Sequence, residues 1–67
     1  MDKIQAKKII SEGLRRAISR EPLQGAWQIW EVQDFIFKHF GKEKEMEFAE
    51  ICIWKDVKKM NEFLKYF

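Results

Sequence analysis

The chain has very few of the residues that cross-link small proteins or interrupt their helices. Its 67 residues include one cysteine, one histidine, one proline and three glycines. A single cysteine excludes an internal disulfide, and one cysteine with one histidine leaves a zinc site short of its usual four ligands. We therefore expect a single domain, residues 1–67, that binds no metal or cofactor and is stabilised by its core or by a partner subunit.

Long apolar runs and a strong net charge are also missing. No run approaches the roughly 20 residues that a transmembrane helix needs, so we expect no membrane span. The chain begins with Met1-Asp2-Lys3 and a charged stretch rather than the apolar segment of a signal peptide, so we expect a cytoplasmic location. A lone thiol is compatible with that reducing compartment. The net charge of +2 is low for a protein dedicated to nucleic acids.

Apolar side chains recur with the 3.6-residue period of an α-helix, and this period predicts three helices. The first covers residues 3–20, the second 22–40 and the third 42–66. Pro22 suits the start of a helix, and Gly41 has the position of a C-terminal cap. Six Phe, three Trp and one Tyr are enough large side chains for a core. The prediction is an all-α fold, a three-helix bundle.

Each predicted helix has an apolar face when it is read at about 100° per residue. On the last helix, seven apolar side chains form one stripe. They are Met46, Ala49, Ile53, Val57, Met60, Leu64 and Phe67. The second helix has a wider arc, formed by Ala26, Ile29, Trp30, Val32, Ile36, Phe37 and Phe40. We expect these two sets to face the core.

A second interpretation places strands in the middle of the chain. Residues 27–37 and 46–54 are rich in Trp, Ile, Val and Phe, which favour strands. Asp56 would then be a good N-cap for a short helix over 57–66. The result is an α+β order of helix, strand, strand and helix. Neither stretch alternates apolar and polar residues cleanly, so the helical period fits better.

Five large apolar side chains fall outside the main predicted core stripes. They are Trp27, Phe35, Phe48, Ile51 and Trp54. If the second and third helices pair antiparallel, these side chains form one exposed patch, which is typical of an interaction surface. The sequence therefore predicts a small non-enzymatic interaction or regulatory protein that forms a homodimer or binds a different protein. The competing explanation is that these side chains complete the core of a monomer, or that the strand interpretation is correct.

The first helix carries the alternative function. Six Lys or Arg but only two acidic residues lie within residues 1–20. Lys8, Arg15 and Arg16 lie on the helix face opposite the apolar one, where they could contact phosphates. A small DNA-binding regulator, dimerised through the same aromatic patch, is therefore the alternative prediction. Glu12 lies within this basic group and weakens it.

The sequence has no pattern of residues that indicates catalysis. His39 lies at the edge of the apolar arc of the second helix and Cys52 flanks the stripe of the third, so we expect packing roles for both. No Cys/His arrangement, phosphate-binding glycine loop or dinucleotide fingerprint is present. We expect no enzymatic activity.

Overall fold

The computed structural model describes residues 2–19 and 27–67, which form four α-helices. These are α1 (Lys3–Ser19), α2 (Ile29–Phe40), α3 (Lys42–Trp54) and α4 (Val57–Lys65). The described ranges contain no strand, so the all-α prediction is confirmed and the strands predicted at 27–37 and 46–54 are wrong. The second helix begins at Ile29 rather than near Pro22, and residues 22–26 of its predicted start lie outside the described ranges.

The predicted helix over 42–66 is in fact two helices. Lys55 adopts the left-handed conformation (φ 53°, ψ 43°) and ends α3, with its N–H donating to the carbonyl of Ile51 at 2.7 Å. Asp56 then starts α4, because its carboxylate accepts a hydrogen bond from the N–H of Lys59 at 3.1 Å. The N-cap that the strand interpretation proposed is therefore present, although the strands are not. The bundle has four helices instead of three.

The other helix ends carry caps that match the sequence. The carboxylate of Asp2 accepts from the N–H of Gln5 at 2.8 Å at the start of α1. At the start of α2, the N–H of Gln28 donates to the carboxylate of Glu31 at 3.1 Å. Gly41 reverses the chain between α2 and α3 with φ 98°, a value that favours glycine because other residues clash there.

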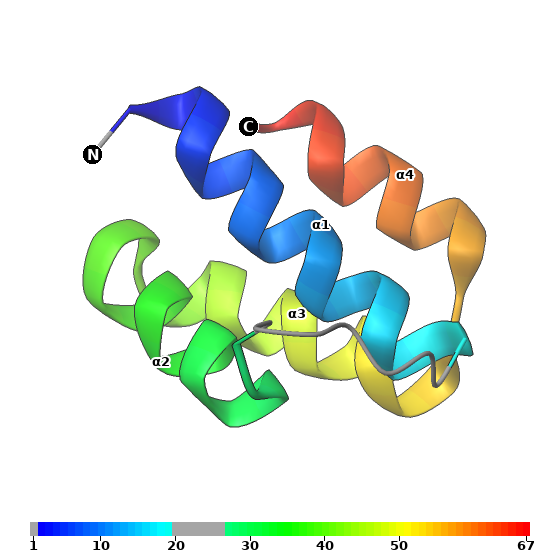
Figure 1. The fold of residues 1–67 in the computed structure, drawn as a ribbon. Coiled ribbons are helices and arrows are strands. Elements are labelled where there is room, and N and C mark those ends of the chain that lie inside the picture. The colour runs from blue at the N-terminus through cyan, green and yellow to red at the C-terminus, as the bar shows by residue number, and fades with distance from the viewer. Residues whose placement is uncertain (1, 20–26) are drawn as a thin grey trace.

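The four helices form two layers (Figure 1). Helices α2 and α3 make an antiparallel hairpin through Gly41, and α1 crosses this hairpin. Helix α4 lies beside α1 and runs in the opposite direction, which brings the two chain ends together. The Lys3 ammonium accordingly lies 5.7 Å from the centroid of the Tyr66 ring.

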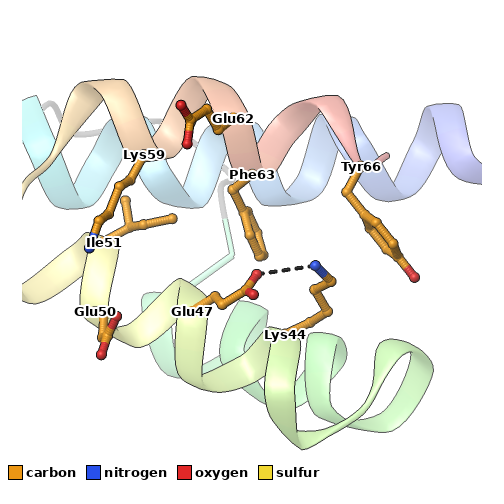
Figure 2. Close-up of a pocket in the computed structure, with 8 residues that line it drawn as sticks. All are labelled: Lys44, Glu47, Glu50, Ile51, Lys59, Glu62, Phe63 and Tyr66. Atoms are coloured by element: carbon orange, nitrogen blue, oxygen red, sulfur yellow. Dashed lines mark hydrogen bonds and ion pairs between the residues drawn. The ribbon is translucent and has the colours of Figure 1, made fainter.

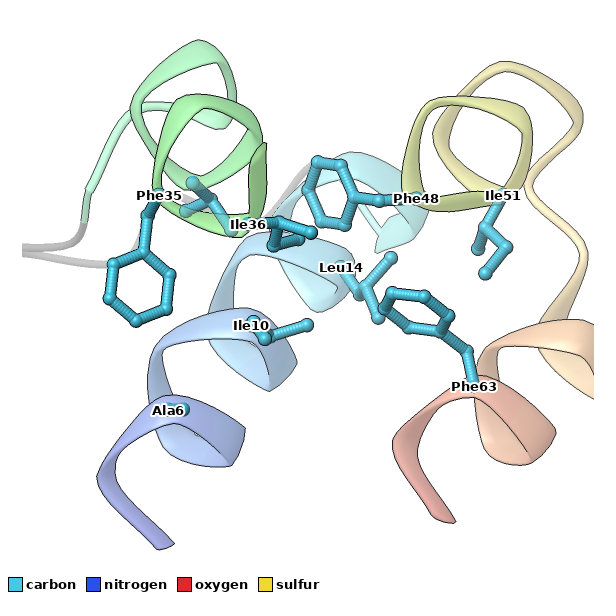
Figure 3. Close-up of a cluster of buried hydrophobic side chains, with 9 residues drawn as sticks. Ala6, Ile10, Leu14, Phe35, Ile36, Phe48, Ile51 and Phe63 are labelled. Atoms are coloured by element: carbon cyan, nitrogen blue, oxygen red, sulfur yellow. The ribbon is translucent and has the colours of Figure 1, made fainter. Parts of the chain in front are cut away.

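The core fills the space between the layers (Figure 3). Nine apolar side chains are buried: Ala6, Ile10, Leu14, Val32, Phe35, Ile36, Phe48, Ile51 and Phe63. Gly13 lets α1 approach α2 closely, because a Cβ at this position would lie 3.0 Å from a methyl group of Val32. All four helices thus contribute to a single interior.

Candidate functional site

The aromatic patch predicted from the sequence does not exist as one surface. Phe35, Phe48 and Ile51 are at most 6% exposed and belong to the core of one subunit. Only Trp27 and Trp54 remain exposed, at 39% and 76%. Trp27 packs edge-on against Phe35, with ring centroids 5.7 Å apart. The predicted set therefore divides into three core residues and two separate surface residues.

The break at Lys55 explains this error for α3. A single helical wheel over 42–66 follows the inner side of α4, where Met60 and Leu64 do pack against the core. Helix α3 has its own axis and orientation, and it directs Phe48 and Ile51 inward. The side chains that the wheel assigned to the core of α3 then point to solvent. On α2, the arc was centred too far toward Trp30.

A different apolar surface results on the side of the α2–α3 hairpin that faces away from α1 and α4. Trp30 (70% exposed) and Phe37 (48%) lie seven residues apart on α2. Met46 (57%) and Ile53 (71%) lie seven residues apart on α3. At 100° per residue, each pair is roughly 150–180° from the buried side of its own helix. We call these four residues the outer face.

The outer face consists of two pairs of side chains, which we call rungs, and each rung has one residue from α2 and one from α3. In an antiparallel hairpin that turns at Gly41, residues equally far from the turn lie side by side. Phe37 and Met46 are four and five residues from Gly41, and Trp30 and Ile53 are eleven and twelve residues away. The rungs are therefore about 10 Å apart along the helices. Trp54 and Val57, at 76% and 50% exposed, lie at the junction of α3 and α4 that follows Ile53.

Acidic side chains border this surface. Asp34 lies one helical turn from both Trp30 and Phe37, and it pairs with Lys38 at 3.0 Å. Glu43 and Glu50 are exposed one turn from Met46 and Ile53. The hairpin helices α2 and α3 together hold three Lys against six Asp or Glu, a net charge of −3.

The opposite layer is basic. Helices α1 and α4 together hold eight Lys or Arg against two Glu, a net charge of +6. Lys8 and Arg15 are exposed as predicted, and both lie roughly opposite the buried side of α1. Arg16 is half-buried on a flank of α1.

Two lysines that the sequence reading missed complete this side. Lys58 and Lys65 are exposed on α4, seven residues apart and opposite buried Phe63. Their spacing puts them on the polar side of the helix in either reading, but only the packing of α4 beside α1 joins them to Lys8 and Arg15. We call Lys8, Arg15, Lys58 and Lys65 the basic face. It lies on the side of the molecule opposite the outer face.

A hollow lies between α3 and α4 (Figure 2) and is lined by charged side chains of both helices together with Ile51, Phe63 and Tyr66. Its volume is about 390 Å³. The Lys44 ammonium enters it, 3.2 Å from a carboxylate oxygen of Glu47 and 4.2 Å from the centroid of the Tyr66 ring. These contacts satisfy the cation within the subunit, so they explain how α4 is held against α3.

Cys52 and His39 both pack against other side chains of the subunit. Burial raises the pKa of the Cys52 thiol to about 11, which keeps it protonated and poorly nucleophilic at neutral pH. The His39 ring contacts the Phe35 ring in a tilted arrangement, with centroids 4.6 Å apart. Within residues 2–19 and 27–67, no three His, Cys, Asp or Glu side chains gather in a way that could hold a metal ion.

In the same part of the chain, no helix combines the length and apolar character needed to cross a bilayer. Comparisons with protein-family models, curated proteins and solved structures found no match to this chain.

Proposed function

We propose that this chain is a small, non-enzymatic protein-interaction module of the cytoplasm that associates with a second copy of itself through the outer face. The observation that carries the proposal is the exposure of Trp30, Phe37, Met46 and Ile53, at 48–71%, on one side of a fold whose interior is already filled. Scattered apolar residues are ordinary on protein surfaces. Four large ones in two aligned rungs are typical of an interface.

The exposed area supports a second copy as the occupant. Together with Trp54, the outer face exposes on the order of 500–700 Å² of side chain, judged from the usual areas of such residues. A standard interface buries about 800 Å² per partner. The total accessible surface of the subunit is only 4874 Å², so association would cover more than a tenth of it. A chain this short gains stability when two copies share apolar surface.

The arrangement of the rungs is compatible with two-fold symmetry. Each rung pairs an aromatic residue of α2 with an aliphatic residue of α3. A two-fold axis between the rungs brings the Trp30 rung of one copy against the Phe37 rung of the other. Such an isologous contact uses the same surface on both subunits and closes after two copies.

The experiment introduces a charge into the outer face. In Ile53→Glu, association would bury an unpaired carboxylate, which costs several kcal/mol. The expected result is a single-chain mass in size-exclusion chromatography with light scattering, under conditions where the unmodified chain has twice that mass.

Ile4→Glu is the matched control, because Ile4 is 83% exposed and lies on α1, away from the outer face. This variant should keep the dimer mass. Far-UV circular dichroism should give the same helical spectrum for both variants. A dimer that survives Ile53→Glu, or that Ile4→Glu disrupts equally, would contradict the proposal.

A further inference from the structure

We propose that the basic face binds the phosphate backbone of double-stranded DNA without reading its sequence. The low net charge of +2 conceals an uneven distribution of charge, because α1 and α4 alone carry +6. The cations come from two helices that lie side by side in one layer (Figure 1). The proposed site is therefore broader than the row on α1 that the sequence indicates.

The spacing of the four cations suits a surface of repeated charges. Lys8 and Arg15 are about 10 Å apart along α1, and Lys58 and Lys65 are about 10 Å apart along α4. Packed helices have axes about 8–10 Å apart. The four side chains thus form two rows about 10 Å apart. Duplex DNA carries one negative charge per roughly 1.7 Å of its axis, so several phosphates lie within reach of these rows.

Each of the two acidic residues of this layer lies one turn from two of these cations, on the side away from the other row. Glu62 is exposed at the edge of the hollow between α3 and α4, one turn from Lys58 and Lys65 and on the side of α4 turned away from α1. Lys3 faces Tyr66, which follows α4, so Lys3 marks the side of α1 that faces α4. Glu12 lies about 180° around the helix from Lys3 and is therefore turned away from α4. Neither carboxylate comes between the two rows of cations.

The distribution of aromatic residues favours duplex DNA over single strands and over membranes. Binding of single strands combines a basic groove with aromatic side chains on which bases stack. Membrane-surface helices combine cations with neighbouring Trp, Phe or Leu. Trp30, Phe37 and Trp54 lie on α2 and α3, in the layer opposite the basic face. In the basic layer, the Tyr66 ring is taken up by contacts with Lys3 and Lys44. Ile4 is an exposed aliphatic residue one turn from Lys8. The basic face therefore lacks an aromatic cluster, which suits contacts to a phosphate backbone.

If the chain also dimerises as proposed above, the two basic faces point in opposite directions. One dimer would then hold two duplexes together. This consequence rests on the proposed function, whereas binding of a single duplex does not.

The test is the double variant Lys58→Gln/Lys65→Gln, measured by fluorescence anisotropy with a duplex of about 20 base pairs. Four phosphate contacts predict a slope of log affinity against log salt near −3.6 for the unmodified chain. The variant should lower that slope by about two and weaken binding about 100-fold at 50 mM salt.

The matched control is Lys38→Gln/Lys42→Gln, which removes the same charge from α2 and α3. Both pairs contain one lysine in the first turn and one in the last turn of a helix. The control should bind the duplex within about threefold of the unmodified chain. Equal weakening by both double variants would overturn the proposal, as would tighter binding to single strands or to vesicles of anionic lipid than to the duplex.

A capture assay tests whether one dimer holds two duplexes. Protein is bound to an immobilised duplex, and the capture of a second, labelled duplex from solution is measured. Ile53→Glu should keep single-duplex affinity and lose this capture. If the unmodified chain forms the dimer but does not bind the duplex, the DNA proposal alone is overturned. If the unmodified chain binds the duplex but stays a monomer, only the dimer is overturned.

Discussion

Phe48 and Trp54 are six residues apart on α3 and have opposite environments. Phe48 is 0% exposed and Trp54 is 76% exposed. Phe48→Ala should lower the free energy of unfolding by about 3–5 kcal/mol, because it leaves a cavity between the layers. Trp54→Ala should change it by less than about 1 kcal/mol. Urea denaturation of both variants in the Ile53→Glu background, which removes the contribution of association, measures both. Equal losses for the two variants would contradict the assigned packing of α3.

The thiol of Cys52 provides a second test at the residue scale. Because burial raises its pKa to about 11, the thiolate fraction at pH 8 should be on the order of 100-fold below that of an exposed cysteine. Alkylation by iodoacetamide should be slower by a similar factor and should accelerate about tenfold per pH unit up to about pH 11. A reaction as fast as that of a free thiol at pH 8 would show that Cys52 is not packed in this way.

At the scale of the element, the junction of α3 and α4 is the most informative segment. Lys55 occupies the left-handed region with φ 53°, where a side chain costs about 1–2 kcal/mol relative to glycine. Lys55→Gly should therefore stabilise the fold by about 0.5–1 kcal/mol after the greater flexibility of glycine in the unfolded chain is included. The melting temperature should rise by several degrees, since about 1 kcal/mol corresponds to roughly 4–8 °C in a domain of this size.

Lys8→Gly is the matched control for this prediction. Lys8 is exposed inside α1, where glycine should cost about 1 kcal/mol. The two variants should thus shift the melting temperature in opposite directions. A drop with Lys55→Gly would mean that α3 continues through this position, as the sequence first suggested.

The sequence was sufficient to predict the helical class and most helix ends. The period of apolar residues, together with Gly41, predicted that α2 ends at Phe40, and it predicted α1 to within one residue of its end at Ser19. The break after Trp54 was missed because a lysine in the left-handed conformation leaves no mark in the sequence. Asp56 was a signal, but an N-cap residue alone does not end the preceding helix.

Missing the break between α3 and α4 also led to a wrong prediction of the exposed apolar surface. A wheel drawn through two helices assigned Met46 and Ile53 to the interior, and they are 57% and 71% exposed. The exposure of Lys8 and Arg15 was predicted correctly, because α1 is one uninterrupted helix. Lys58 and Lys65 join them only through the packing of α4 beside α1, which the sequence does not show.

At the scale of the whole molecule, the two layers differ in chemistry. One outer surface is basic, and the other is apolar with an acidic border. Apolar association should persist as salt is added, because salt screens the repulsion between the acidic borders. Contacts to phosphates should instead weaken steeply with salt. The two proposed activities can therefore be separated by ionic strength.

The central claim is that a second copy covers the outer face. Sedimentation equilibrium of the unmodified chain up to about 100 μM tests it most directly, because the mass of a reversibly associating chain depends on its concentration. The account predicts that the mass rises with concentration to twice the chain mass of 8.2 kDa. A mass that stays at 8.2 kDa across the whole range would contradict it.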